Sequence, residues 1–173
     1  MYELHEHEQY FFDEPTLSHL ANFVSNWKSP CCLCTPSLGK KLVESGIDAT
    51  ILDVDKRFSD VQGFVYYDIY KPQWQTRTFD LIICDPPFFN VSLSQLFSAI
   101  RMLSHHNFEQ PILVSYLTRR SSAIRGTFAP FQLRESGYFP GYQTVRKIEK
   151  NEIEFFGNLS DDQVTTLKEI GIG

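Results

Sequence analysis

The segment Asp85-Pro86-Pro87-Phe88 contains the residue types best suited to chemistry. Its two prolines hold the chain extended after Asp85 and leave the Pro86 carbonyl free to point into a cleft beside the carboxylate. An amino group between these two acceptors would donate one hydrogen to each, which would orient its lone pair for attack. The segment therefore predicts group transfer to an amine nitrogen, as in N-methylation, with Phe88 as a flat face for the acceptor. A plain turn is the alternative, because Asp and Pro are common in turns.

The residues before this segment form the clearest strand of the sequence. Residues 79–84 are almost continuously apolar, as expected of a parallel strand covered on both faces, and the prolines end it. Further strands are predicted at 30–34, 49–54, 63–67 and 111–116. Helices are predicted at 15–27, 93–103, 118–128 and 159–170, and at 37–46 with Ser37 as the cap.

This alternation of strands and helices predicts an α/β fold with a mostly parallel sheet flanked by helices. Near the end, 142–148 and 152–156 flank Glu149-Lys150-Asn151 and predict a C-terminal antiparallel hairpin at the sheet edge. The 173 residues are 42% hydrophobic and include 15 Phe, which is ample material for one core. A single domain spanning 1–173 is therefore expected.

Acidic and turn residues follow several of these strands, where open parallel sheets bind their ligands. Thr35-Pro36-Ser37 follows the first strand, Asp53 and Asp55 the second, and Asp68 the third. An acid at the second strand can accept both hydroxyl protons of a ribose, as adenosine cofactors require. Asp55 is the first choice for this role, with Asp53 one strand period away, and Asp68 would accept from an adenine amino group. Each has a structural alternative as a turn former or helix cap.

Charge and cysteine content limit the classes of partner. Lys and Arg number 16 against 21 Asp and Glu, a net charge of −5, so a polynucleotide acceptor would need a local basic patch or a partner protein. The four cysteines fit no zinc spacing, which predicts buried core residues and no metal. No apolar run approaches the roughly 20 residues of a membrane span, and the first ten residues are acidic and polar. The chain is expected to be cytoplasmic, with no membrane association.

The motifs together resemble a known family. The D-P-P-F segment resembles the signature of amino methyltransferases, in which Asp, Asn or Ser precedes two prolines and an aromatic residue. The likeness to the N6-adenine methyltransferase-like family covers nearly the whole chain and rests on these further segments: Tyr10-Phe11-Phe12-Asp13-Glu14-Pro15-Thr16, Cys34-Thr35-Pro36-Ser37-Leu38, Asp53-Val54-Asp55-Lys56-Arg57-Phe58, Tyr67-Asp68 and Asn151-Glu152.

The resemblance implies a Rossmann-like class I methyltransferase that uses S-adenosyl-L-methionine. It implies that the D-P-P-F residues are catalytic, and that Thr35, Pro36, Ser37, Asp53, Asp55 and Asp68 bind the cofactor. The glycines common in the first loop of methyltransferases are replaced by Pro36 and Ser37, a substitution that the family shares. Acceptor contacts are implied for Phe11, Phe12, Phe88 and Phe89. A hydrophobic staple onto the first helix is the alternative for the Tyr10 to Phe12 stretch.

Three hypotheses about function stay open: two differ in the methyl acceptor, and the third is a protein without activity. Adenine in DNA or RNA is favoured by Phe88, with Arg119, Arg120 and Arg125 as candidate phosphate contacts. A protein lysine suits the small size and acidic balance, and the family includes members that methylate lysine on translation elongation factor 1-alpha beside one that methylates adenine in ribosomal RNA. An inactive adenosine-binding module is the third reading, which the intact Asp85 and Phe88 disfavour.

Overall fold

The computed structural model describes residues 1–5, 9–144 and 152–169. Its strands are β1 (Pro30–Leu33), β2 (Thr50–Asp53), β3 (Phe64–Tyr66), β4 (Leu81–Cys84), β5 (Ile112–Leu117), β6 (Arg134–Glu135) and β7 (Ile153–Gly157). Its α-helices are α1 (Glu14–Val24), α2 (Pro36–Glu44), α3 (Leu93–Leu103), α4 (Ser121–Thr127) and α5 (Asp161–Glu169). None of these helices is long and apolar enough to cross a bilayer.

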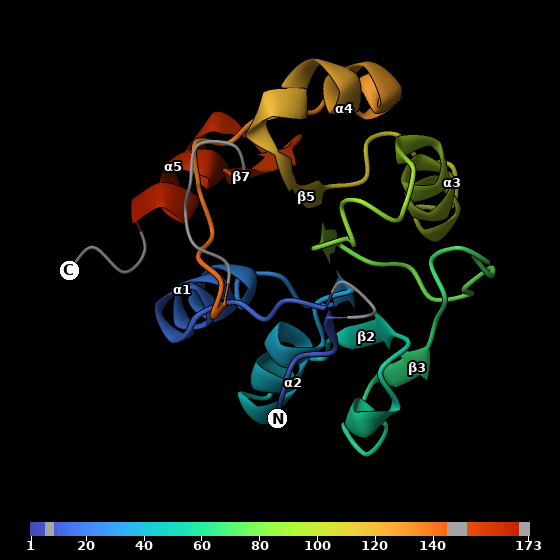
Figure 1. Ribbon diagram of the computed structural model, residues 1–173, viewed down its shortest axis with the longest axis vertical. Helices are drawn as coiled ribbons and strands as arrows, with labels where there is room; N and C mark the ends of the chain where they lie inside the picture. The colour runs from blue at the N-terminus through green and yellow to red at the C-terminus, as the bar shows by residue number, and fades with distance from the viewer. Residues whose placement is uncertain (6–8, 145–151, 170–173) are drawn as a thin grey trace.

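The strands form one sheet in the order β3-β2-β1-β4-β5-β7-β6 (Figure 1). β1 to β5 run parallel, whereas β7 runs antiparallel to both β5 and β6. α1, α2 and α5 cover one side of the sheet, and α3 and α4 cover the other (Figure 1). The expected α/β fold, with a mostly parallel sheet and antiparallel strands from the C-terminal part of the chain, is confirmed.

The central strands are short and wholly buried. Every residue of β1, β2, β4 and β5 is buried, which explains why their sequences are apolar without alternation. β4 pairs with β1 through Leu33↔Cys84 and with β5 through Cys84↔Val114. Because these parallel strands end at one edge of the sheet, the residue after β4, Asp85, lies between the ends of its two neighbours.

Local capping chemistry sets the helix boundaries. α3 agrees with the prediction, and Ser92 and Gln95 form a reciprocal capping box at its start. The prediction that Ser37 caps the second helix is wrong. α2 begins at Pro36, with Thr35 at the cap position, because the fixed φ and missing N–H of proline suit the first helical turn.

The expected C-terminal hairpin lies partly outside the described residues, since these omit 145–151. In the described part, β7 pairs with β5 on one side and with β6 on the other. The short strand β6 follows α4 and a single 3-10 turn at Ala129–Phe131. Tyr142, placed by the sequence in the first arm of the hairpin, forms a single antiparallel bridge with Phe12 instead. Phe12 is thus the strand partner of Tyr142, while β6 pairs with the edge of β7 that does not pair with β5.

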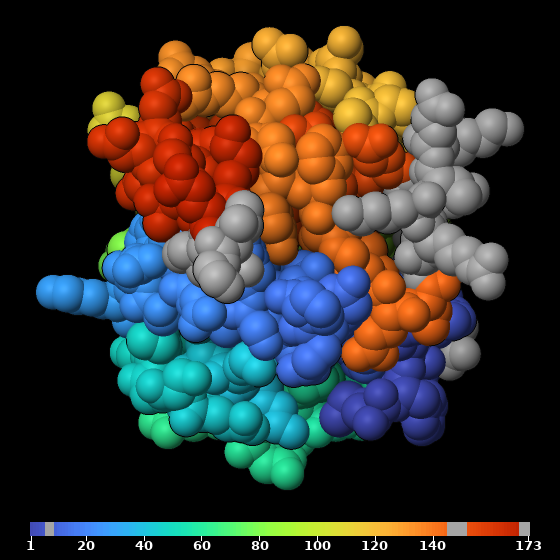
Figure 2. Space-filling view, turned by 90° about the vertical axis from the view of Figure 1, so that its left-hand side faces the viewer, coloured from blue at the N-terminus to red at the C-terminus, as the bar shows by residue number. Residues whose placement is uncertain are grey.

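Residues 11–13 and 141–143 form a junction that holds the N-terminal segment against the sheet. The Asp13 amide donates to the Gly141 carbonyl at 2.9 Å, and the Gln143 amide donates to the Phe11 carbonyl at 3.0 Å. Figure 2 shows the orange chain that ends at residue 144 lying against the dark-blue N-terminal residues. The approach requires glycine, because a Cβ on Gly141 would lie 2.1 Å from Oδ2 of Asp13.

Gly141→Ala is expected to lower the free energy of unfolding by roughly 1 to 2 kcal/mol, the value of a lost helix cap. The added methyl group displaces the Asp13 carboxylate, which caps α1 by accepting from the Thr16 amide at 2.9 Å. Urea unfolding measures the change. Gly126→Ala is the control, because no atom lies within 4 Å of the position that its added methyl group would take in α4, and it should be neutral or stabilising by up to about 1 kcal/mol. Equal effects at both positions would contradict the role of the junction.

Candidate active site

A cavity of about 610 Å³ opens beyond the carboxyl ends of β1, β2, β3 and β4. Its size is ordinary for a small-molecule site. The residues that line it are 4, 9–12, 34–38, 53–56, 66–70, 85–88 and 90. The structure therefore brings together twelve of the thirteen residues predicted for the site. Phe89 is the exception, since it is 67% exposed and does not line the cavity.

Asp85 presents one of its two carboxylate oxygens to this cavity. Oδ1 accepts hydrogen bonds from the Ser115 hydroxyl at 2.5 Å and from the Tyr142 hydroxyl at 2.7 Å. Neither Oδ2 nor the Pro86 carbonyl accepts a hydrogen bond from the described residues. The two acceptors that the sequence analysis singled out are therefore both available to a ligand.

The environment of Asp85 favours its neutral form more than water does. Burial raises the pKa of Asp85 to about 7, although the hydrogen bonds from Ser115 and Tyr142 lower it. The residue lines the cavity and is partly exposed there, so its carboxyl group is removed from bulk water but open to a ligand. Near neutral pH this group can exist in both protonation states, as a group that takes up a proton in a reaction should.

Phe88 forms part of the cavity wall rather than an open platform. It is 8% exposed, and its ring meets that of Tyr116 edge to face, with 6.1 Å between centroids. The chain turns directly after it, since the amides of Asn90 and Val91 both donate to the Pro87 carbonyl. A flat acceptor would thus meet Phe88 inside the cavity, next to Asp85.

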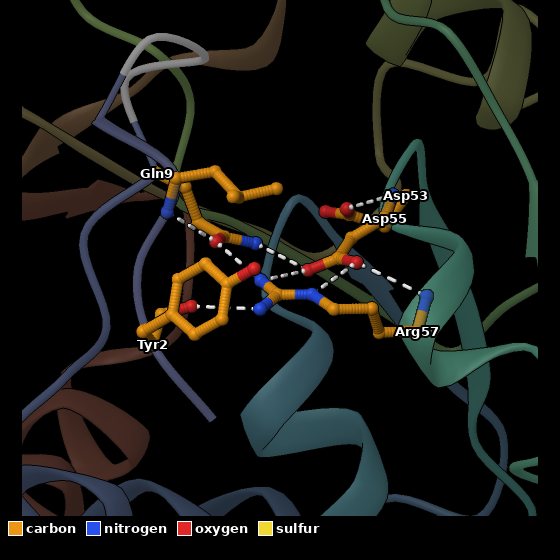
Figure 3. A network of polar contacts seen from close by, with 6 residues as sticks. Tyr2, Gln9, Asp53, Asp55 and Arg57 are labelled. Carbon is orange, nitrogen blue, oxygen red and sulfur yellow. Dashed lines mark hydrogen bonds and ion pairs between the residues drawn. The ribbon is translucent and has the colours of Figure 1, made fainter.

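The two carboxylates at the end of β2 differ in what already binds them (Figure 3). Asp55 accepts four hydrogen bonds: three from Arg57, at 2.8 to 3.1 Å, and one from the Gln9 amide at 2.7 Å. Asp53 accepts one side-chain bond, from the Asp55 amide to Oδ1 at 2.8 Å. Each carboxylate oxygen has about two acceptor sites, so Asp55 is saturated while Asp53 keeps one oxygen for a ligand.

The pKa values of the two groups follow from these contacts. Burial raises the pKa of Asp53 to about 6, because the hydrogen bond from the Asp55 amide and the nearby Val54 amide offset only part of the desolvation, to which the Asp55 charge adds. Burial also acts on Asp55, but the hydrogen bonds from Arg57 and Gln9 outweigh it and hold the pKa of Asp55 below its usual value. Asp55 is therefore a firmly ionised anchor for the Arg57 side chain.

Arg57 also ties the first residues of the chain to this end of β2. Its NH1 donates to the Tyr2 carbonyl at 2.9 Å, and its guanidinium lies over the Tyr2 ring at 4.9 Å from the centroid (Figure 3). Its NH2 donates to Oε1 of Gln9 at 3.1 Å. Through these contacts the N-terminal segment, which lines the cavity at residues 9–12, is fastened beside Asp53.

The loop after β1 replaces a glycine-rich turn with a cysteine and a proline. Cys34 has a φ of 59°, a left-handed conformation that glycine adopts more easily. The Thr35 hydroxyl has no oxygen or nitrogen partner among the described residues, and only the Cys32 thiol lies beside it. The buried Tyr67 hydroxyl likewise lacks a partner in the described chain. Both residues line the cavity, so a polar ligand there would find unused donors and acceptors.

The remaining predicted residues, Asp68, Phe11 and Phe12, also line the cavity. Asp68 lines the cavity and accepts from the Tyr70 amide at 2.9 Å. Phe11 and Phe12 line it too, and the Phe12 ring packs on that of Tyr142 at 5.4 Å. Among the described residues, no group of three or more His, Cys, Asp or Glu is placed to hold a metal ion.

The arginines proposed as phosphate contacts lie beyond the end of β5. Arg119 and Arg120 are exposed there, and Arg120 donates to the Tyr116 hydroxyl at 2.6 Å. Arg125 is paired with Glu135 at 3.6 Å. Because β5 adjoins β4, Arg119 and Arg120 share the sheet edge at which Asp85 lies.

Sequence reasoning missed the donors that hold the carboxylates. Ser115 is the polar residue within the buried strand β5, and a serine in an apolar run is a signal that could have been noticed. Gln9 and Tyr142 give no such signal, because each reaches the site from a segment far along the chain. Arg57 stands two residues after Asp55, but its pairing with that carboxylate depends on the local turn.

Asp85→Asn is expected to raise the free energy of unfolding at pH 8 by up to about 4 kcal/mol, because the pKa shift from 3.8 to about 7 penalises the ionised native state. The asparagine oxygen can still accept from Ser115 and Tyr142. This difference in the free energy of unfolding between the variant and the parent protein should shrink as the pH falls from 7 towards 4. Asp85 is then protonated in the native parent protein, so the cost of burying its charge disappears. Urea unfolding across this range measures the difference. A gain that is the same at every pH would contradict the raised pKa.

The chain is similar to known proteins in sequence and in fold. Residues 3–159 match the family described as probable N6-adenine methyltransferase. No curated protein sequence matches the chain. Among solved structures, a putative RNA methyltransferase from Pyrococcus horikoshii is similar, with a TM-score of 0.57, 18% identity and 92% of each chain covered.

Two further solved structures share the fold at low identity. One is a TehB-like S-adenosylmethionine-dependent methyltransferase from Corynebacterium glutamicum, with a TM-score of 0.56, 12% identity, and coverage of 82% of this chain and 88% of that one. The other is magnesium protoporphyrin IX methyltransferase from Synechocystis with bound S-adenosylmethionine. Its TM-score is 0.55 and its identity 13%, with 83% of this chain and 78% of that one covered. The fold is thus the Rossmann-like fold of class I methyltransferases. By the match over most of its length, the chain belongs to the N6-adenine methyltransferase family and is an S-adenosylmethionine-dependent methyltransferase.

Proposed function

We propose that this methyltransferase acts on the exocyclic amine of adenine in a nucleic acid, with Asp85 and Pro86 as the groups that bind the acceptor nitrogen. The observation that carries the proposal is the free Oδ2 of Asp85 beside the free Pro86 carbonyl, at a cavity that Phe88 also lines. Two unused acceptors on adjacent residues match in number the two hydrogens of a primary amine. Phe88 and Pro87 then contact the adenine ring that carries this amine.

The cavity fits the cofactor of the family. It combines an apolar wall with a carboxylate oxygen on Asp53 and two unpartnered hydroxyls, on Thr35 and Tyr67. We assign the ribose contact to Asp53, because Asp55 is saturated by Arg57 and Gln9. Thr35, Pro36, Ser37 and Asp68 complete the cofactor site in this proposal, with Asp68 near the adenine.

Asp85 has two tasks in the transfer. S-adenosylmethionine supplies a methyl group on a positively charged sulfur, which keeps the bonding electrons as the nitrogen lone pair forms the new bond. Asp85 first accepts a hydrogen bond from the amine and so directs the lone pair away from itself. It then takes the proton that the methylated nitrogen loses, which suits a pKa of about 7.

A nucleic-acid acceptor also fits the basic residues at this edge of the sheet. Arg119 and Arg120 are exposed beyond β5, and neither has a carboxylate partner among the described residues. They can meet phosphates while the base enters the cavity. With a net charge of −5, such local contacts rather than the whole surface would hold the polynucleotide.

A second candidate is a protein lysine, and the charge of the cavity favours it. Among the described residues, Asp53, Asp55, Asp68 and Asp85 line the cavity, against a single cation, Lys56. A lysine ammonium is attracted to such a site, and a carboxylate with a pKa near 7 is a better base for removing its proton than an ordinary aspartate. In this case Phe88 is a wall of the lysine channel.

Asp53→Asn is expected to weaken S-adenosylmethionine binding by roughly 1 to 3 kcal/mol, the value of hydrogen bonds to a charged group. Asp55→Asn should weaken it less, because Asp55 acts through Arg57 and Gln9. Isothermal titration calorimetry at pH 7.5 compares the two isosteric variants, with exposed Asp60→Asn as the matched control. A larger loss in Asp55→Asn would move the ribose contact to that residue.

Methyl transfer from radiolabelled S-adenosylmethionine to fractionated lysate identifies the acceptor. We expect label in an RNA or DNA fraction and at least a hundredfold loss of label with Asp85→Ala, while cofactor affinity stays within about twofold, since one positioned proton acceptor contributes roughly that much or more. Label in a nuclease-resistant protein band would show that the acceptor is a lysine and not adenine. Full activity in Asp85→Ala would remove Asp85 from the reaction altogether.

A further inference from the structure

We infer that Ser115 and Tyr142 are positioning residues for the acceptor, which act by holding Oδ1 of Asp85 so that Oδ2 alone faces the reacting nitrogen. The inference rests on the proposed role of Asp85. It adds two residues that neither touch the acceptor nor belong to the D-P-P-F segment. They reach Asp85 from β5 and from the segment 141–143.

The geometry fixes one oxygen and frees the other. Ser115 is fully buried and Tyr142 is 9% exposed, so neither hydroxyl can readily exchange its partner for water. Both donate to the same oxygen, at 2.5 and 2.7 Å, within the range of charge-assisted O–H···O bonds. A carboxylate held through one oxygen by two donors cannot rotate without breaking both bonds. The remaining oxygen therefore keeps one direction, towards the cavity.

The same two bonds stabilise the ionised form of Asp85. Burial favours the neutral carboxyl, and the two donors oppose it. Burial and the Asp85 charge raise the pKa of Tyr142 well above its ordinary value, so Tyr142 stays protonated and keeps donating. Removal of either hydroxyl should leave Asp85 neutral over a wider pH range.

Other titratable groups near Asp85 do not replace these donors. The Cys84 thiol lies beside it, and burial raises the pKa of this thiol well above its usual range, so it stays neutral. The charged residues that line the same cavity are Asp53, Asp55, Asp68 and Lys56. Ser115 and Tyr142 are the donors to Asp85 in the described part of the chain.

Tyr142 is itself held by the N-terminal segment. It pairs with Phe12 through an antiparallel bridge, and the hydrogen bonds of Asp13 and Gln143 flank this bridge on both sides. The Phe12 ring packs against the Tyr142 ring at 5.4 Å. The second donor to Asp85 therefore depends on the pairing of segments about 130 residues apart.

Tyr142→Phe and Ser115→Ala test the inference, each by removing one hydroxyl. The Asp85 carboxyl is titrated by carbon-13 NMR in the free protein, and the methyl-transfer rate is measured against pH. In each variant we expect the Asp85 midpoint to rise by about one pH unit, the effect of one hydrogen bond to a carboxylate. The rate should fall by more than the roughly fivefold at pH 7 that the shifted midpoint explains. It should stay at least about threefold low at pH 9, where Asp85 is ionised in both proteins, because the carboxylate is no longer held in one direction; the KM for S-adenosylmethionine should not change.

Tyr138→Phe is the matched control, because its ring packs on that of His19 and it makes no bond to Asp85. An unchanged Asp85 midpoint in both test variants, or an equal shift in Tyr138→Phe, would overturn the inference. Asp85→Ala separates this result from the proposed function. If that variant is inactive while the midpoints do not move, the positioning role alone is wrong; if that variant is active, the role of Asp85 is wrong.

Discussion

A carboxyl group can be buried only where neighbouring groups donate to it, because an unpaired buried charge costs several kcal/mol. Asp85 meets this constraint at the centre of the sheet. β4 lies between β1 and β5, so the residue after it is enclosed on both sides. β5 supplies the Ser115 hydroxyl, and the segment 141–143 supplies that of Tyr142. The strand order places Ser115 next to Asp85, and the pairing of residues 11–13 with 141–143 holds Tyr142 there.

Three aspartates at the same cavity show how the surroundings divide one residue type among different tasks. Asp55 is saturated by Arg57 and Gln9, and its pKa is lowered. Asp53 has one free oxygen and a pKa of about 6, and Asp85 has one free oxygen and a pKa of about 7. The number of donors separates an ion-pair anchor from two groups that can bind a ligand. Of the three, Asp85 has the pKa nearest to neutral pH, where proton transfer is most useful.

The sequence was sufficient for the elements whose causes are local. The apolar run of β4, the capping box of α3 and the residues after each strand could all be read directly, and the parallel sheet brought those residues to one cavity. The choice between Asp53 and Asp55 could not be made in this way, because it depends on which carboxylate Arg57 and Gln9 bind. The start of α2 was misplaced because proline at the first turn replaces a capping side chain.

Long-range contacts account for what the sequence left out. Tyr142 lies 57 residues from Asp85 and pairs with a segment near the start of the chain, and no periodicity records such a contact. Bringing together segments this far apart costs loop entropy and adds no strand to the central sheet. The buried strands β1, β2, β4 and β5 pair with one another, whereas the junction joins the N-terminal segment to residues 141–143 through the buried side chains of Phe12 and Tyr142. Because Tyr142 donates to Asp85 from this junction, the ionised state of the carboxyl depends on a contact outside the central strands.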